Sequence, residues 1–270
     1  MVILPMRQSS KASKETIAHA YESSQFNEVL DEVLHPGGLE LTARVAEVAE
    51  INSKSCVLDI SSGRGTTSCF LAQQFGCHIT GIDISPLSTS LASHKVDVQN
   101  LSPLIDFLAA DAEHLPFSDS TFDVIISECS FSLQIDKQRG AGEIARVLKP
   151  GGKFVLTDVM LKSNLSQELK TDLTFSCCFS GAETMEGYTR LFTEAGLRLD
   201  WQEDHSTALK KVTYQVITGY GSLSAFWEQF GSKSSPCCPV GGDTTGSRKL
   251  WLRMLQEGKP GYGLFSFTKP

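Results

Sequence analysis

The sequence contains no apolar run that approaches the roughly 18 residues of a membrane span. Its start, Met-Val-Ile-Leu-Pro-Met-Arg, lacks the basic region and the long apolar core of a secretory signal peptide. It also has no run rich in lysine and arginine, and 24 Lys and Arg residues against 31 Asp and Glu residues give a net charge of −7. These absences predict a cytoplasmic protein that acts on a small molecule, with no membrane or nucleic-acid partner.

Internal repeats and low-complexity tracts are absent as well, so the 270 residues predict one large domain or one domain with an insertion. Eight cysteines are present, and a cytoplasmic setting would keep them reduced. We therefore expect packing residues or reactive thiols and not a disulfide framework.

The stretch from Cys56 to Ser68 runs from an apolar strand through a glycine turn into a helix. Gly63 and Gly65 let the chain turn sharply and approach a ligand closely. A strand, a glycine-rich turn and a helix N-terminus together suit a nucleotide-like cofactor. Asp83 ends a second apolar strand 24 residues after Asp59 (83 − 59), where a carboxylate can bind a ribose diol. That spacing alone also fits a dinucleotide-binding fold.

Three further segments distinguish a dinucleotide-binding fold from other folds that bind a nucleotide-like cofactor. Residues 110–117 read Ala-Asp-Ala-Glu-His-Leu-Pro-Phe, residues 122–127 read Phe-Asp-Val-Ile-Ile-Ser, and residues 147–153 read Val-Leu-Lys-Pro-Gly-Gly-Lys. Together with the glycine turn, this ordered series resembles the class I S-adenosylmethionine (SAM) dependent methyltransferases over about residues 40–200. Ser61 stands where that family's Asp-x-Gly-x-Gly-x-Gly pattern has its first glycine. Serine is small, and we expect cofactor binding to survive this departure.

The resemblance implies SAM as the cofactor and places the family's contacts on matching positions of this chain. From the methionine end to the adenine end, the predicted contacts are Asp59, Ser61, Gly63, Arg64, Gly65, Asp83, Ile84, Asp111 and Ala112, with Ser127 at the end of a neighbouring strand. In the family an N-terminal segment folds over the cofactor, and Tyr21 is the residue that we place there. Plain helix packing is the alternative for Tyr21.

Apolar stretches at about 56–60, 78–83, 104–109, 122–127 and 153–158 alternate with helical ones, which predicts a parallel sheet covered by helices on both faces. Residues 197–204 and 262–268 are the expected sixth and seventh strands, the seventh antiparallel as in the resembled class. The predicted fold is thus α/β, a Rossmann-like seven-stranded sheet. Its expected parts are a helical cap at 1–50, a SAM-binding core at 51–204, a helical lid or substrate insertion at 205–261 and a last strand at 262–270.

Helix signals add detail to this fold. Thr184 and Gly196 have the residue types of an N-cap and a stop for a helix between them. Within the insertion, helices are expected at about 207–229 and 247–257.

The predicted topology divides the cysteines into two groups. Cys56 and Cys77 fall at the starts of strands, on the edge away from the ligand, where we expect structural roles. The remaining six could face the cofactor side, and they are Cys69, Cys129, Cys177, Cys178, Cys237 and Cys238.

One cysteine segment narrows the resemblance. Residues 175–182, Phe-Ser-Cys-Cys-Phe-Ser-Gly-Ala, resemble the Cys-x-Gly-Gly-Ala region of arsenite methyltransferases, with Cys178 on the arsenic-binding cysteine. Cys237 and Cys238 occupy roughly the place of that family's second arsenic ligand, although the sequence around them does not match. Ser68 stands where that family has its cysteine after the glycine turn, and Cys69 follows one position later. This departure argues against carrying the family's disulfide relay over to this chain.

Trivalent arsenic is thiophilic, and two or three thiolates can bind it while its lone pair stays free. The residues leave three interpretations open: a thiol site, redox-active pairs that would call for a thiol reductant, or cysteines without a shared role. The same thiols could also take zinc, and we assign no metal site. The candidate thiols of the reaction are Cys177, Cys178, Cys237 and Cys238.

Methyl transfer from SAM needs mainly alignment of donor and acceptor and exclusion of water. An oxygen or nitrogen acceptor would call for a general base, and His114, Glu128 and His205 are candidates by position. The sequence therefore predicts a SAM-dependent methyltransferase, monomeric or homodimeric, for trivalent arsenic or another thiol-bound soft acceptor. The alternatives are a methyltransferase for an unrelated small metabolite and a non-catalytic SAM-binding or metal-binding protein.

Overall fold

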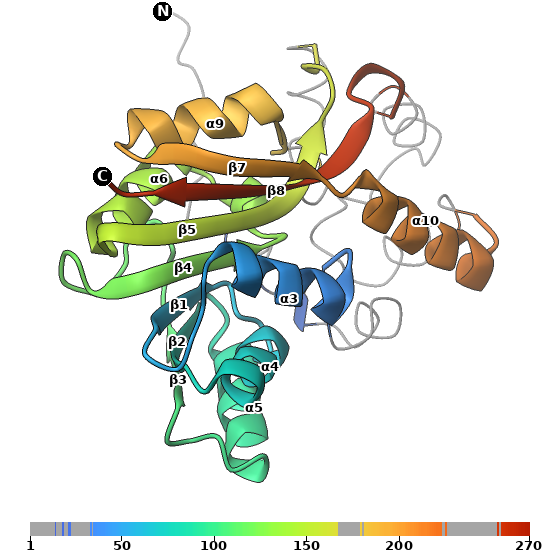
Figure 1. Ribbon diagram of the computed structural model, residues 1–270. Coiled ribbons are helices and arrows are strands. Elements are labelled where there is room, and N and C mark those ends of the chain that lie inside the picture. Colours follow the sequence, from blue (N-terminus) through green and yellow to red (C-terminus); the bar gives the residue numbers. More distant parts are fainter. Residues whose placement is uncertain are drawn as a thin grey trace, which may run out of the picture.

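The computed structural model describes residues 14, 18, 21, 22, 33, 35–166, 179, 181–222, 225, 253 and 255–270. A single twisted sheet runs through its centre, and the strands follow the order β3-β2-β1-β4-β5-β8-β7 (Figure 1). These strands are β1 Cys56–Ile60, β2 His78–Asp83, β3 Ile105–Ala109, β4 Phe122–Glu128, β5 Leu148–Leu161, β7 Arg198–Asp204 and β8 Pro260–Thr268.

The first five strands are parallel, and β8 lies antiparallel between β5 and β7. This confirms the predicted α/β sheet and the direction of its last strand. The structure adds β6, Glu183–Thr184, which pairs with the end of β5 outside the main path. Strand β5 also begins earlier than residue 153, because Leu148 already pairs with Phe122 before the register shifts.

Helices cover both faces of the sheet (Figure 1). Helices α3 Gly38–Val48, α4 Thr66–Phe75 and α5 Pro86–Val98 pack on one face, and α6 Lys137–Val147 and α9 Met185–Glu194 pack on the other. Successive residues of a strand point to opposite faces, so Val57 contributes to the first of these two cores and Leu58 to the second. A strand buried on both sides has to be apolar almost throughout, as β1 and β4 are.

Helix ends follow local chemistry. Thr184 caps α9 by accepting a hydrogen bond from Gly187 N at 3.1 Å, which confirms the predicted start of this helix. Helix α10, Ser206–Tyr220, ends where Gly221 adopts the left-handed conformation with φ 78°, and of the rest of the expected helix at 207–229 only residues 221, 222 and 225 are described. Most of the helix expected at 247–257 lies outside the described residues.

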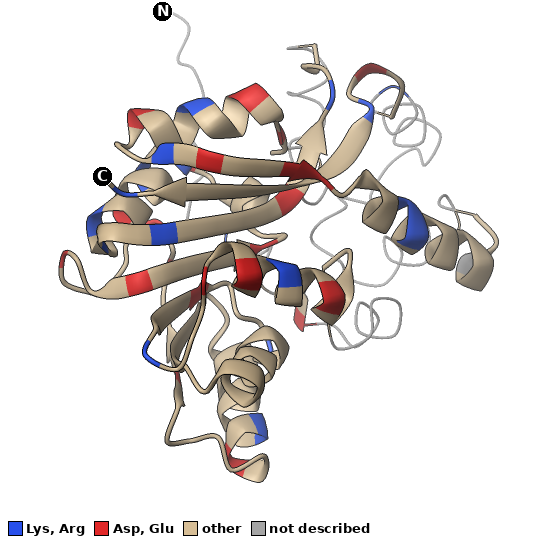
Figure 2. Ribbon diagram, viewed as in Figure 1, with Lys and Arg blue, Asp and Glu red and all other residues tan. Residues whose placement is uncertain are grey.

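Acidic and basic residues are interspersed along the helices and strands (Figure 2). Among the described residues, no helix is long and apolar enough to cross a membrane.

Candidate functional site

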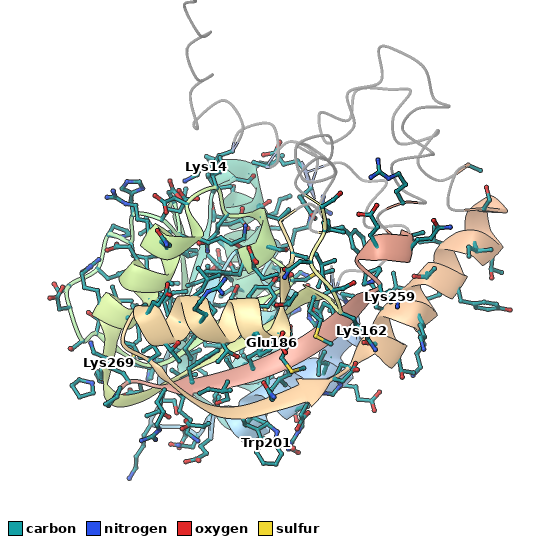
Figure 3. All side chains as sticks on the ribbon, turned by 90° about the horizontal axis from the view of Figure 1, so that it is seen from above. Lys14, Lys162, Glu186, Trp201, Lys259 and Lys269 are labelled. Carbon is teal, nitrogen blue, oxygen red and sulfur yellow. The ribbon has the colours of Figure 1, made fainter. Side chains whose placement is uncertain are left out.

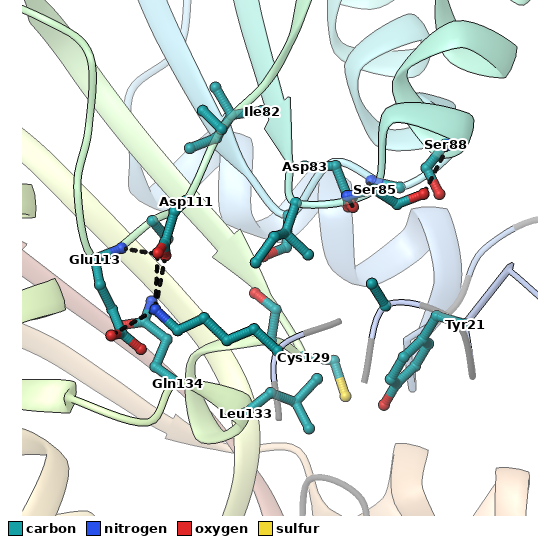
Figure 4. Close-up of a pocket in the computed structure, with 18 of the residues that line it drawn as sticks. Tyr21, Ile82, Asp83, Ser85, Ser88, Asp111, Glu113, Cys129, Leu133 and Gln134 are labelled. Carbon is teal, nitrogen blue, oxygen red and sulfur yellow. Dashed lines mark hydrogen bonds and ion pairs between the residues drawn. The ribbon is translucent and has the colours of Figure 1, made fainter. Parts of the chain in front are cut away.

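A cavity opens at the carboxyl ends of the parallel strands, the edge where α/β sheets bind ligands (Figure 4). Its wall comes from the glycine turn after β1, the end of β2, the loop after β3, the turn after β4 and a few N-terminal residues. The structure places these residues predicted from the sequence on that wall: Tyr21, Ser61, Gly63, Arg64, Asp83, Ile84, Asp111 and Ala112.

Three other predicted contacts do not line the cavity. Asp59 is 3% exposed beneath the glycine turn, where it accepts a hydrogen bond from Ser68 Oγ at 2.6 Å. Burial raises the pKa of Asp59 to about 7. Ser127 is fully buried with its hydroxyl 2.8 Å from that of Ser130, and Gly65 packs on the helix side of the turn.

The glycine turn is built from left-handed residues. Ser61, Gly63 and Gly65 have φ values of 60°, 53° and 75°. A side chain at Gly65 would place its Cβ 2.6 Å from the ring of Phe107, so only glycine fits there. Ser61 adopts the left-handed conformation at a cost of about 1 kcal/mol, which explains why glycine is the usual residue at this position of the motif.

Asp83 joins the glycine turn to the start of α5. Its Oδ2 accepts a hydrogen bond from Gly63 N and its Oδ1 one from Ser85 N, both at 2.9 Å. Burial raises the pKa of Asp83, and the backbone donors offset this only in part. Each oxygen keeps a further acceptor position, so Asp83 can still accept a hydrogen bond from a ligand hydroxyl.

Glu128 lies at the end of β4, where three protein donors approach its carboxylate. Thr67 Oγ1 donates to it at 2.8 Å, Thr42 Oγ1 donates at 3.2 Å, and His35 Nε2 lies 3.2 Å away. Burial works to raise the pKa of Glu128, but the charge of His35 and these donors outweigh it and the pKa lies below its usual value. Conversely, Glu128 holds the pKa of His35 above its usual value against the opposing effect of burial. Glu128 is therefore an ion-pair partner and a poor general base.

The two histidines proposed as bases do not line the cavity either. His114 is 55% exposed with Nδ1 3.4 Å from Asp111, and His205 Nε2 lies 2.7 Å from Glu203 beyond the end of β7.

N-terminal residues border the cavity mouth. Lys14, Ala18 and Tyr21 line it at the spacing of one helix face, and Glu22 Oε1 accepts a hydrogen bond from Ser85 Oγ at 2.6 Å. Sequence reasoning identified Tyr21 but missed Lys14. No local motif marks this lysine, because its partners come from a loop almost a hundred residues later in the chain.

The turn after β4 contributes the wall opposite the ends of β2 and β3. A short 3₁₀ helix, η1 Phe131–Leu133, directs Leu133 and the following Gln134 to the cavity. Asp158 of β5 anchors it by accepting hydrogen bonds from Ser132 N at 2.7 Å and Ser132 Oγ at 2.8 Å. Burial raises the pKa of Asp158 to about 6, although these donors lower it in part.

The four described cysteines have different positions. Cys129 lines the cavity, Cys69 is buried in the core, and Cys56 and Cys77 lie at the amino ends of β1 and β2, away from the cavity. The other four, Cys177, Cys178, Cys237 and Cys238, lie outside the described residues.

A family model described as a methyltransferase domain matches residues 51–196, the span that holds the glycine turn and most of the cavity wall. The chain belongs to this family. The methyltransferase is 28% identical over 240 residues to methyltransferase GfsG of Streptomyces halstedii, covering 88% of this chain and 82% of that protein. It is 34% identical over 144 residues to an arsenite methyltransferase of Halobacterium salinarum, covering 52% of this chain and 36% of that protein.

Solved structures share the fold of this methyltransferase. The crystal structure of the [4+2]-cyclase SpnF superposes with a TM-score of 0.75 at 21% identity over 98% of both chains. Phosphoethanolamine N-methyltransferase 2 of Haemonchus contortus, solved with S-adenosylmethionine, gives a TM-score of 0.72 at 18% identity over 99% of this chain and 61% of that one. Family and fold together identify a class I SAM-dependent methyltransferase, as the sequence predicted.

Proposed function

We propose that this methyltransferase transfers the methyl group of SAM to a soft acceptor that already carries a free lone pair, with thiol-bound trivalent arsenic as the first candidate. One observation carries the proposal. Among the described residues that line the cavity, the carboxylate next to the turn after β4 is Glu128, and its oxygens are occupied by Thr42, Thr67 and His35. These donors and the charge of His35 hold the pKa of Glu128 below its usual value, so Glu128 is a poor proton acceptor and a methyl acceptor that needs no deprotonation suits this wall best.

In this proposal the cofactor spans the cavity. Its methionine end lies at the glycine turn, near Ser61, Gly63 and Arg64. Asp83 accepts hydrogen bonds from the ribose hydroxyls, and Asp111 accepts one from the adenine amino group. When bound, SAM supplies an electrophilic methyl on a sulfonium, and the protein's contribution is to align donor and acceptor and to exclude water.

The cysteine pairs are the proposed binding site for the acceptor. Cys178, with Cys177 beside it, and one of Cys237 or Cys238 would hold arsenic through thiolates, which suits a soft centre. All four lie outside the described residues, and their role rests on the resemblance of residues 175–182 to the arsenite methyltransferases. Cys129 on the cavity wall provides a further thiol within reach of a ligand there.

A second candidate is a small organic metabolite. The match to methyltransferase GfsG covers more of both proteins than the match to the arsenite methyltransferase does. An organic acceptor would use the same cofactor site and leave the cysteine pairs without a shared role.

The cofactor assignment is tested by Asp83→Ala. Loss of a charged acceptor for ligand hydroxyls should weaken SAM binding by about 1.5 to 3 kcal/mol, measured by isothermal titration. Asp106→Ala is the matched control, because Asp106 is an exposed aspartate on the neighbouring strand β3 and does not line the cavity. A less than twofold change in the dissociation constant for Asp83→Ala would remove Asp83 from the ribose site.

The acceptor is tested with arsenite and a thiol reductant. We expect stoichiometric arsenite binding to the reduced protein, methylated arsenic as the product, and loss of both in Cys178→Ser with SAM affinity unchanged. Cys69→Ser is the control, since Cys69 is a buried core residue outside the cavity. Absence of arsenic methylation in the wild type would favour the organic acceptor, whereas arsenic methylation unaffected by Cys178→Ser would remove Cys178 from the acceptor site.

A further inference from the structure

Lys14 is held at one end of the cavity by two carboxylates. Its Nζ lies 2.8 Å and 3.0 Å from the two oxygens of Asp111 and 2.6 Å from Glu113 Oε2, contacts that appear as dashed lines in Figure 4. The Lys14 side chain is only 13% exposed. A lysine ammonium has three N–H donors, and three carboxylate oxygens lie within hydrogen-bonding distance of this one. Lys14 thus has no donor left for a ligand.

The protein also fixes both carboxylates from the other side. Asp111 Oδ1 accepts a hydrogen bond from Glu113 N at 3.0 Å. Glu113 Oε1 accepts hydrogen bonds from Ile135 N at 2.8 Å and Asp136 N at 3.1 Å. Burial works to raise the pKa of Asp111, but the hydrogen bonds from Lys14 and Glu113 N outweigh it, and the pKa lies below its usual value. Asp111 is therefore ionised and held in one orientation at neutral pH.

We propose that Lys14 is a positioning residue for base recognition, which acts through Asp111 to make the cavity accept a 6-aminopurine and reject a 6-oxopurine. This rests on the proposed assignment of Asp111 to the adenine. An ionised carboxylate offers acceptors only, so it pairs with the N6 amino group of adenine and repels the O6 carbonyl of hypoxanthine. Without Lys14, Asp111 can turn or take up a proton and then donate to O6. Sites built to hydrogen-bond one ligand group discriminate strongly against a ligand that lacks it.

The test compares S-adenosylhomocysteine with S-inosylhomocysteine, whose bases differ at C6 and in the proton that hypoxanthine carries on the neighbouring N1. Their dissociation constants are measured by isothermal titration on the wild type, Lys14→Met, Lys14→Arg, Asp111→Asn and Lys162→Met. Methionine keeps the length of lysine without its charge. Lys162 is the control, because it is a half-exposed lysine that pairs with Asp204 and lies well away from Lys14 (Figure 3).

We expect Lys14→Met to reduce the preference for the adenosyl ligand about tenfold or more. Lys14→Arg should restore part of the preference, and Lys162→Met should leave it unchanged. The ratio of two affinities on one protein does not depend on how much of a variant is folded, so partial unfolding cannot imitate the effect.

The remaining outcomes distinguish a failure of the proposed role of Lys14 from a failure of the assignment of Asp111 to the adenine. A preference lost in Asp111→Asn but retained in Lys14→Met overturns the role of Lys14 and leaves Asp111 at the adenine. A preference unchanged in both variants removes Asp111 from the base site. Equal tightening of both ligands by Lys14→Met would mean that Lys14 competes with the cofactor, which also overturns the proposal.

Discussion

Three buried carboxyl groups in or behind the cavity wall differ in ionisation because their partners differ. Asp59 has one hydroxyl donor and a pKa raised by burial to about 7, whereas Glu128 faces His35 and two threonines and has a lowered pKa. Asp158 lies between these cases, with a pKa raised by burial to about 6. Residue type alone would assign all three the same charge at neutral pH.

The stability of the protein should depend on pH through Asp158. An acid whose pKa is higher in the folded state binds its proton more tightly there, so stability falls as pH rises between about 4 and about 6. The shift corresponds to a cost on the order of 3 kcal/mol once Asp158 is ionised. Asp158→Asn removes this titration, so its melting temperature minus that of the wild type should increase with pH across that window. A difference that stays constant from pH 4 to 6 would show that Asp158 does not titrate there.

For single residues, the sequence predicted where a side chain lies in the fold better than it predicted the partners of that side chain. The motif placed Ser61, Gly63 and Asp83 on one ligand edge, because strand ends and glycine turns are local features. It could not assign Glu128, whose partners at positions 35, 42 and 67 come from two helices and a loop far away in the sequence.

Helix α3 and strand β7 are tied together at the surface by Glu203. Its carboxylate accepts hydrogen bonds from Arg44 Nη2 and Trp201 Nε1, both at 2.6 Å, and lies 2.7 Å from His205 Nε2. The hydrogen bond from Arg44 is the main cause that lowers the pKa of Glu203 to about 2. Trp201 and Lys14 lie on opposite sides of the molecule, so this cluster is remote from that end of the cavity (Figure 3).

Glu203→Gln should lower the free energy of unfolding by about 1 kcal/mol, a modest value because Arg44 is more than one-third exposed. The contribution is complete above about pH 4.5 and is lost as pH falls toward 2, since a lowered pKa favours the ionised folded state. Denaturant titration at pH 7 and pH 3 measures both effects. Glu47→Gln is the matched control, because Glu47 pairs with the same arginine but is 65% exposed and should change stability by less than about 0.5 kcal/mol. Equal losses in the two variants would contradict the anchoring role of Glu203.

Elements with their own caps were predictable, as α9 with Thr184 shows. The end of α10 at Tyr220 was not, because a glycine within a helical pattern can continue the helix or take the left-handed conformation that Gly221 adopts. Strand β6 has only two residues and exists through its pairing with β5, so no sequence period could mark it.

Across the whole molecule the sheet has two chemically different edges. The carboxyl ends of the parallel strands carry the cavity, and the amino ends carry Cys56 and Cys77. Cys77 is fully buried, and burial raises the pKa of its thiol to about 11, so this thiol is protonated at neutral pH.

Cys77→Ser should destabilise the protein by about 1 to 3 kcal/mol, because it buries a more polar group, and Cys56→Ser should cost less. Neither substitution should change turnover per folded molecule. Thermal melting and a methyl-transfer assay on the same preparations test this, with Cys129→Ser on the cavity wall for comparison. Lost activity at an unchanged melting temperature in either strand-start variant would contradict the separation of the two edges.

The position of β8 has a consequence for how the chain folds during synthesis. Strand β7 is made first, but among the described strands its one partner is β8, which in turn pairs with β5 more than ninety residues before it. Until the ribosome has released residues 260–268, the outer edge of β5 is unpaired and β7 has no neighbour. Long-range pairing of this kind is slow. The nascent protein therefore exposes an apolar strand edge until β8 is made, the interval in which a chaperone would have most to bind.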